Sequence, residues 1–426
     1  MITIDRFERE LPAALSDVAG TGRSDYLNDI LGRTARTRQR PAWASLERWL
    51  PVNIAILRVP VTRVPWRPFV AAVLVLLLVV ALLAVYLGGQ RRVPPPFGPA
   101  GNGLIPYTVD GNLYVGDPIT GSTRLLVDGS DDYAGPSFSS DGAMVAFLHS
   151  IADGVDDILV VDADGRNVRK ISAEPVHFID YAQWIPGTHS IIVSHRVADR
   201  YRLDVFEATG GTAPRMLLQD AKVLWAISRP PTGREILLDA KVDGLWGLYT
   251  IPSDGGVPRL LQATSVDIGP DDDPGQDLNF PAYSPDGSRI YYNRYVAQAQ
   301  TIQAWVMDAD GANKHRFNTS GPASGWWEGE MAPSPDGKWV LMWRVGSSSG
   351  NAITLFPADG SGDGVVIGPH VTDTAHWLWS PDSTKVLLNF NQATEGDQGL
   401  IDVTTGRFTA LPWRADTEPD WQRVAP

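Results

Sequence analysis

The sequence contains no cysteine, and this absence removes several classes of site at once. Without cysteine a chain cannot form disulfides, iron–sulfur clusters, cysteine-ligated zinc sites or cysteine nucleophiles. The fold must therefore be held by its core alone. Because this absence is compatible with oxidising and reducing surroundings alike, it assigns no compartment.

Positive charge is scarce beyond the N-terminal part of the chain. Residues 1–67 hold eleven Arg, no Lys and seven acidic residues, which is an excess of four positive charges. Since the whole chain carries −13, the remainder carries −17. So acidic a region repels phosphates, which argues against nucleic acid as a partner. The basic N-terminal part suits the anionic cytoplasmic leaflet of a membrane.

Signs of disorder and of a collagen-like repeat are also missing. Hydrophobic residues make up 43% of the chain and charged residues only 20%, so there is enough apolar surface to bury a core. The 41 Gly and 33 Pro follow no collagen period, and we interpret them as turn residues between many short strands. The 15 Trp fit the half-buried faces of β-sheets.

One long uncharged run stands out near the N-terminal part. Residues 69–89 read FVAAVLVLLLVVALLAVYLGG, a length that crosses ~30 Å of hydrocarbon as a helix. A buried core helix would keep a polar stripe, and a cleaved signal peptide would have a shorter apolar run near the N-terminus. The run therefore predicts an uncleaved, single-pass transmembrane helix over 67–89. Four Arg between residues 48 and 67 precede it and only Arg91 and Arg92 follow closely, so the positive-inside rule places the N-terminus in the cytoplasm.

Residues 1–66 are predicted to form a cytoplasmic tail of short helices. Apolar residues recur there at helical spacing, as in Ile4, Phe7 and Leu11. The tail is too small to bury much core by itself, so it either folds on a partner or serves as a passive basic anchor. Its candidate partner contacts are the basic residues Arg36, Arg38 and Arg40.

The stretches IDRFERELPAALSDVA (4–19) and DYLNDILGRTARTRQRPAWASLERWLP (25–51) resemble the N-termini of membrane-bound anti-sigma-factor-like bacterial proteins. The resemblance implies a helical segment inside the cell, a sensor domain outside, and a sigma factor as the cytosolic partner. Many anti-sigma domains hold zinc through His and Cys. The chain has no Cys, and its first His is His149, so that subtype is excluded.

Beyond residue 102 the chain repeats a short pattern. A turn of the Ser-Pro-Asp-Gly type is followed by an alternating strand, most clearly at 137–149, 282–294, 332–344 and 379–390. Pro presets φ, Asp bonds nearby amides and Gly takes φ > 0, so the motif forms a tight turn. A second turn and a further strand follow, which makes each unit a β-meander typical of a propeller blade.

These units predict an all-β fold, a β-propeller of about seven four-stranded blades, preceded by the transmembrane helix and the short helical tail. Six and eight blades stay open, because degenerate units are easy to miscount. The expected domains are a tail (1–66), a transmembrane helix (67–89), a Pro-rich linker (90–102) and an extracytoplasmic propeller (103–426). We expect a C-terminal strand around Trp421 to complete the first blade and close the ring.

The Ser-Pro-Asp-Gly units resemble the TolB-type family of WD40-like propellers. The resemblance implies an envelope-facing binding platform, often without catalysis. TolB is soluble and has an extra N-terminal α/β domain, whereas this chain has a predicted membrane anchor. The particular partners of TolB are therefore not implied.

The sequence offers no convincing catalytic constellation. GSSSG at 346–350 matches the hydrolase motif G-x-S-x-G, which requires a strand, a turn and a helix. Here the motif joins two predicted strands of one blade, which indicates a hairpin loop and argues against a serine hydrolase. Prolyl-peptidase-like enzymes add a catalytic α/β domain after their propeller, and we expect none after residue 426. We expect no enzyme activity and no cofactor.

Two clusters are candidates for ligand contact. Asp271, Asp272 and Asp273 with Asp277 are the best metal candidates, because clustered carboxylates suit Ca²⁺; a solvated acidic loop is the alternative.

Trp326 and Trp327 are adjacent on a predicted strand and should face opposite sides. An exposed Trp beside Glu328 would stack on a sugar or anchor a protein partner, and core packing is the alternative.

The function expected from these features is that of a membrane-anchored binding or sensor platform. It would hold a ligand or protein outside the cytoplasm and meet a cytosolic protein, such as a sigma factor, through its tail. A lactonase- or lyase-like propeller enzyme and a purely structural envelope scaffold stay open as alternatives.

Overall fold

The structure is a computed structural model, which describes residues 70–79, 93–129, 133–198, 200–264, 277–278, 280–296, 301–318, 326–346, 350–371, 375–390, 398–416 and 420–425. The chain divides into two compact units, Met1–Gln90 and Arg91–Pro426.

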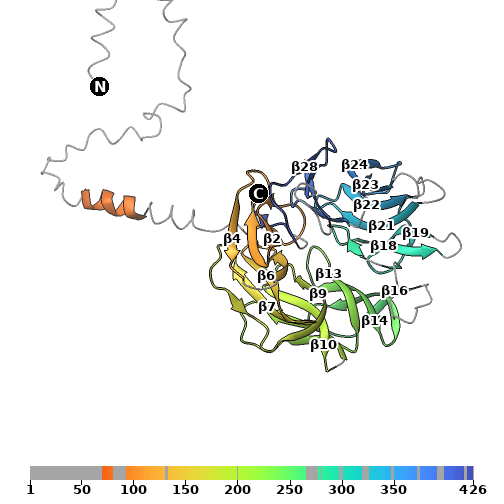
Figure 1. Cartoon of the computed structure of the whole chain (residues 1–426), viewed down its shortest axis with the longest axis horizontal. Coiled ribbons are helices and arrows are strands. Elements are labelled where there is room, and N and C mark those ends of the chain that lie inside the picture. Colours follow the sequence, from red (N-terminus) through yellow and green to blue (C-terminus); the bar gives the residue numbers. More distant parts are fainter. Residues whose placement is uncertain are drawn as a thin grey trace, which may run out of the picture. The chain divides into compact units, whose positions relative to one another are not determined.

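The first unit contributes one described helix, over residues 70–79 (Figure 1, orange). All of its residues are apolar and exposed, and Leu76 and Leu78 each leave 62% of their surface free. Within the described residues, no helix combines the length and the apolar character needed to span a membrane. Residues 67–69 and 80–89 of the predicted span lie outside the described residues, as does the predicted tail, 1–66.

The second unit is built from antiparallel sheets of consecutive strands. Four of these sheets contain four strands each, hydrogen-bonded in chain order. They are β13 (Lys222–Ser228), β14 (Glu235–Val242), β15 (Leu245–Pro252) and β16 (Arg259–Ala263); β17 (Ala282–Tyr283), β18 (Arg289–Val296), β19 (Thr301–Asp308) and β20 (His315–Arg316); β21 (Trp326–Pro333), β22 (Trp339–Gly346), β23 (Gly350–Pro357) and β24 (Val365–Val371); and β25 (Ala375–Trp379), β26 (Lys385–Phe390), β27 (Gly399–Asp402) and β28 (Phe408–Ala410).

One larger sheet joins two repeat units that the sequence predicts to be separate. Its strands are β5 (Tyr133–Phe138), β6 (Met144–Ala152), β7 (Val155–Asp162), β8 (Arg169–Lys170), β9 (Val176–Trp184), β10 (Ser190–Val197), β11 (Arg200–Glu207) and β12 (Arg215–Gln219). The link is a short pairing of β7 with β9, in which Val155 lies opposite His177 and Asp156 opposite Val176. Otherwise β5–β8 and β9–β12 follow the same four-strand order.

The first sheet holds β2 (Ile105–Val109), β3 (Asn112–Gly116) and β4 (Thr123–Val127), and the C-terminal segment runs beside it. The amide of Asp416 donates to Thr108 O at 2.7 Å, and that of Gln422 donates to Leu104 O at 2.8 Å. Farther along, β29 (Arg423–Val424) pairs antiparallel with β1 (Gly101–Asn102). The predicted C-terminal strand therefore lies along the first blade, and residues 101–102, predicted as linker, form a strand with it.

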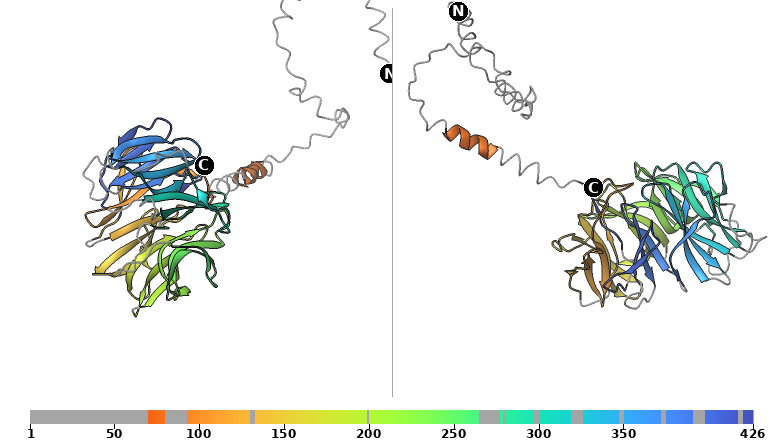
Figure 2. Two further views of the ribbon diagram at one scale, coloured as in Figure 1. Left: turned by 90° about the vertical axis from the view of Figure 1, so that its right-hand side faces the viewer. Right: turned by 90° about the horizontal axis from the view of Figure 1, so that it is seen from above.

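The sheets of the second unit follow one another around a ring in chain order (Figure 1). The colours pass from orange at β2 through yellow and green to blue at β28, and the C-terminus returns to the orange strands. The right-hand view of Figure 2 shows the same meeting of the first strands with the C-terminus. The order and pairing of the strands define an all-β propeller fold.

The Ser-Pro-Asp-Gly motif forms the tight turn that the sequence predicts. Ser334 Oγ donates to Asp336 Oδ1 at 2.7 Å and accepts from the amide of Trp339 at 3.0 Å, while Gly337 takes a φ of +71°. Burial raises the pKa of Asp336, but hydrogen bonds from Ser334 and Lys338 outweigh this and leave it lowered. The motif thus fixes the hairpin between the first two strands of each unit that carries it.

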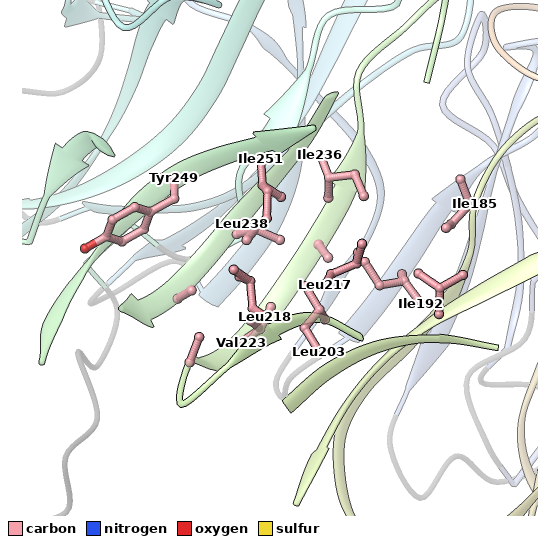
Figure 3. Packing of buried hydrophobic residues seen from close by; sticks show 14 residues of the cluster. Ile185, Ile192, Leu203, Leu217, Leu218, Val223, Ile236, Leu238, Tyr249 and Ile251 are labelled. Atoms are coloured by element: carbon pink, nitrogen blue, oxygen red, sulfur yellow. The ribbon is translucent and has the colours of Figure 1, made fainter. Parts of the chain in front are cut away.

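Apolar side chains from facing sheets form the core. In one cluster, Ile192, Leu203 and Leu217 of the β9–β12 unit pack against Leu238 and Ile251 of the next sheet (Figure 3). Alternate residues of each strand point to opposite faces, so each sheet packs on both of its neighbours. Apolar contacts of this kind therefore join neighbouring sheets.

Candidate functional site

The ring of sheets has two unlike faces. In an antiparallel meander, the turn after the first strand and the turn after the third strand lie at the same end. This end carries the Ser-Pro-Asp-Gly turns and is named the turn face. The opposite end, where each first strand begins, is named the loop face. The connection that contains Asp271, Asp272 and Asp273 joins β16 to β17 and so belongs to the loop face.

The segment 95–102, named the N-terminal strap, contacts several turns of the turn face. The amide of Ala100 donates to Pro381 O at 2.9 Å in the turn after β25. A Cβ placed on Gly187 would lie 3.6 Å from Pro96, and one placed on Gly233 would lie 3.6 Å from Phe97. These turns belong to three different sheets, so the strap crosses the turn face.

Arg423 ties the strap to the C-terminal strand. Its Nη2 donates to Pro95 O at 3.0 Å and also to Gly98 O. Burial lowers the pKa of Arg423, while the Asp420 carboxylate opposes that shift. The two ends of the second unit are therefore held together at the turn face.

The loop face presents exposed aromatic rings where first strands begin. Phe178, Phe280 and Trp327 leave 54%, 44% and 44% of their surfaces exposed. Phe178 and Phe280 each have a φ of +49°, in the left-handed region that a bulky residue rarely adopts. Such strained positions cluster at functional sites, because the surrounding structure must hold them there.

A row of alternating rings and cations, named the cation–aromatic ladder, crosses the loop face. Arg196 Cζ lies 5.3 Å from the ring centre of Phe178 and 4.7 Å from that of Tyr201. Lys222 Nζ lies 5.9 Å from the ring centre of Tyr201 and 5.7 Å from that of Trp246. Each cation thus sits between two rings, at distances where the ring quadrupole attracts it.

A second aromatic row links three successive first-strand regions. The Tyr181 ring lies 5.2 Å from Trp225, and Trp225 lies 5.4 Å from Phe280 in an edge-on arrangement. The Tyr181 hydroxyl donates to Ala226 O at 2.7 Å, and burial raises its pKa. The row therefore connects the exposed ring of Phe280 at the loop face with the partly buried rings of Trp225 in β13 and Tyr181 in β9.

The structure buries Glu328 rather than exposing it beside the exposed Trp327. Its Oε2 accepts from the amide of Ala304 at 2.9 Å and lies 3.3 Å from Arg316, and its Oε1 lies 3.6 Å from Arg344. Burial lowers the pKa of Arg344, and Glu328 opposes that shift. The carboxylate therefore holds neighbouring sheets together.

Asp277 is also buried, with 1% of its surface exposed. Its Oδ2 accepts from Thr264 Oγ1 at 2.7 Å, and its Oδ1 accepts from the amide of Tyr295 at 2.8 Å. These bonds connect the end of the acidic insertion to Thr264, directly after β16, and to Tyr295 in β18. Among the described residues no group of three or more His, Asp or Glu is placed to hold a metal ion.

The remaining predicted residues lie outside the described part of the chain. They are Asp271, Asp272, Asp273, Arg36, Arg38 and Arg40. The backbone of Trp326 is described as the start of β21, opposite Gly346, and its side chain is not.

The two glycines of the G-x-S-x-G motif lie opposite each other in a hairpin. Gly346 ends β22, Gly350 begins β23, and the two are register partners. These two described glycines and their flanking strands form a hairpin, whereas the serine hydrolase motif requires a sharp turn from a strand into a helix. The hairpin interpretation of the sequence is confirmed.

The ladder was not predicted from the sequence. Its residues lie on strands between positions 178 and 246, and only pairing of β9, β10 and β11 brings the first three together. A usable signal was the crowding of Arg196, Arg200 and Arg202 around one hairpin of an otherwise acidic region.

Comparison with known proteins assigns a fold class and no family. No protein-family model matches the chain, and no curated protein matches it. Solved structures do match, at identities that bear on the fold alone, and they agree with the propeller described above.

Prolyl oligopeptidase B from Galerina marginata is similar over 77% of this chain and 52% of its own length, with 14% identity and a TM-score of 0.53. A functionally unknown protein from Desulfotomaculum acetoxidans is similar over 76% of this chain and 99% of its own, with 12% identity and a TM-score of 0.51. TolB from Acinetobacter baumannii is a looser match, with 16% identity, 75% and 81% coverage and a TM-score of 0.46. This chain thus spans about half of the oligopeptidase.

Proposed function

We propose that the chain is a membrane-anchored, extracytoplasmic binding or sensor platform that takes its ligand on the loop face. The observation that carries this proposal is the set of exposed rings at that face, Phe178, Phe280 and Trp327. Exposed aromatic side chains give large contact areas at low entropic cost, and they are enriched where proteins bind partners.

The N-terminal strap supports the choice of face. It occupies the turn face through Ala100 and Arg423, so the chain enters the propeller from that side. The strap therefore takes up part of the turn face, and its contacts given above leave the loop face to a ligand. With seven four-stranded repeats, counting the C-terminal segment as the inner strand of the first, we assign seven blades.

The membrane anchor is proposed from residues 67–89. The described part, 70–79, is helical, wholly apolar and exposed, as a lipid-facing helix requires. We propose the N-terminus in the cytoplasm, the propeller outside, and no metal or cofactor in either part.

The tail is proposed to contact a cytosolic protein, as in the anti-sigma-factor-like proteins that its sequence resembles. Arg36, Arg38 and Arg40 are the proposed contacts, and a sigma factor is the proposed partner. Co-purification with the full-length chain tests this. We expect a cytosolic protein to be recovered at physiological salt and lost when all three Arg are changed to Gln; equal recovery would contradict the contact.

We propose a non-enzymatic role, which the exposed rings and the cations described at the loop face support as a binding surface. A protease added outside intact cells tests the topology. It should remove the propeller and spare the tail. Loss of the tail with a protected propeller would overturn the orientation.

A further inference from the structure

In the described part of the chain, no carboxylate pairs with either cation of the cation–aromatic ladder, Arg196 or Lys222. Among the described residues, Lys222 Nζ makes no hydrogen bond or ion pair, and the buried Nε of Arg196 has no hydrogen-bond partner. Arg196 Nη2 donates only to the Tyr201 hydroxyl, at 2.7 Å. The side chain of Asp180 and all of Asp199 lie outside the described residues. The rings orient the cations, and within the described ranges Lys222 Nζ and Arg196 Nη1 have no acceptor.

Two described carboxylates of the same sheet are already paired with other side chains. Asp204 accepts from Arg202 at 2.9 Å and lies 2.9 Å from His195 Nε2. Asp220 accepts from Arg200 at 2.7 Å. Asp204 and Asp220 are therefore engaged by cations other than Arg196 and Lys222, in a part of the chain that carries −17 overall.

The backbone beneath the ladder is closed to a ligand. Arg196 is paired with Tyr201 on one side and with His177 on the other. The amide of Phe178 donates to Gly154 O at 2.8 Å. A peptide that adds as a strand would need a free edge, so recognition here must use ring faces and cationic heads.

We propose that the ladder binds a carbohydrate that carries carboxylate groups, such as a chain of uronic acids. Its sugar rings would lie against the exposed Phe178 ring, and its carboxylates would accept from Arg196 and Lys222. Charge-assisted hydrogen bonds of this kind are the strong ones, and planar guanidinium suits carboxylate. The assignment rests on the proposed function, because it names the ligand class of the proposed loop face.

Calorimetric titration of the full-length chain with oligogalacturonate tests the assignment. Dextran serves as the neutral probe and polyglutamate as the acidic peptide. We expect binding of oligogalacturonate that weakens as salt is added. Lys222→Met should lower the affinity at least tenfold, as should Arg196→Gln. Lys338→Met, at an exposed lysine of the turn face that is paired with Asp336, is the matched control and should leave it unchanged.

Phe178→Gly separates binding from folding. Glycine adopts a φ of +49° without strain, so this variant should keep its melting temperature within a few degrees while losing oligogalacturonate binding. Equal affinity for polyglutamate would overturn the carbohydrate in favour of an acidic peptide. No binding of any probe, or an unchanged affinity in Lys222→Met, would overturn the ladder as this site. Either result leaves the membrane topology, tested by protease, unaffected.

Discussion

At the scale of single residues, one carboxylate, that of Glu328, lies between the β17–β20 and β21–β24 sheets and faces the guanidinium groups of Arg316 and Arg344. Glu328 is 5% exposed and Arg344 is 7% exposed, while Arg316 is only partly buried. Arg344 Cζ also lies 4.6 Å from the ring centre of Phe356. Because burying a charge is costly, the fold tolerates Arg344 only with these partners in place.

Removing the Glu328 carboxylate should therefore destabilise the propeller strongly. We expect Glu328→Leu to lower the free energy of unfolding by about 3–5 kcal/mol, since Arg344 is left buried without compensation. Urea unfolding followed by tryptophan fluorescence measures this. The double variant Glu328→Leu, Arg344→Met should recover much of the loss. A single variant as stable as the parent chain would mean that the ion pair is not formed.

The sequence predicts some of these residues and misses the role of others. Adjacent strand residues face opposite sides, so one of the two neighbouring Trp was expected to be exposed, and Trp327 is. Glu328 beside it points inward, where it accepts from the amide of Ala304 and forms an ion pair with Arg344. The alternation of a strand predicts two faces and cannot say which face a neighbouring sheet covers. Asp277 likewise bonds Thr264 instead of standing free in the acidic insertion.

At the scale of elements, the N-terminal strap and β29 close the second unit. Beside the backbone pairing of β1 with β29, Arg423 links them through its side chain, which donates to Pro95 O and Gly98 O. We expect Arg423→Met to lower the free energy of unfolding by about 2 kcal/mol, because two carbonyls lose a charged donor.

Limited proteolysis is the second readout for this variant. The strap of Arg423→Met should be cut faster than that of the parent chain. Arg166→Met is the control, since Arg166 is exposed in a surface pair with Asp164 and should matter little. Equal cleavage of the strap in Arg423→Met and the control would contradict the link.

Asp420 makes the same closure sensitive to pH. Burial raises its pKa to about 6, against hydrogen bonds from the amides of Trp421 and Phe138 and the charge of Arg423. Because the folded state holds this proton more tightly, the raised pKa contributes stability that is fully present below about pH 4, the ordinary pKa of an aspartate. This contribution to the free energy of unfolding is lost as the pH rises towards 6. We expect Asp420→Asn to match the parent chain at pH 4 and to exceed its free energy of unfolding by on the order of 2 kcal/mol at pH 7. A parallel pH profile for both chains would refute the shift.

At the scale of the whole molecule, the repeat pattern predicts the order of sheets because turn chemistry is local. Gly142, Gly187, Gly233, Gly287 and Gly337 all have positive φ, as the turn motif requires. The long-range features could not be predicted in this way. The β7–β9 bridge, the pairing of β1 with β29 and the ladder each depend on contacts between segments that only the closed ring brings together.

The proposed binding at the loop face requires a closed ring, which the two ends of the second unit hold together at the turn face. Since the chain has no cysteine of its own, two introduced cysteines report on this closure without background. Gly101 and Val424 are register partners in the β1–β29 pair, and a Cβ on Gly101 would lie 2.9 Å from the Val424 side chain.

The decisive measurement is the oxidation of Gly101→Cys, Val424→Cys in the full-length chain, followed by mass spectrometry of the cross-linked peptides. We expect nearly complete disulfide formation in the native protein. None is expected in the control Gly101→Cys, Val365→Cys, whose second position lies in β24. A double variant that stays reduced when native, although its two thiols react freely with maleimide, would contradict the closed ring and, with it, the proposed binding face.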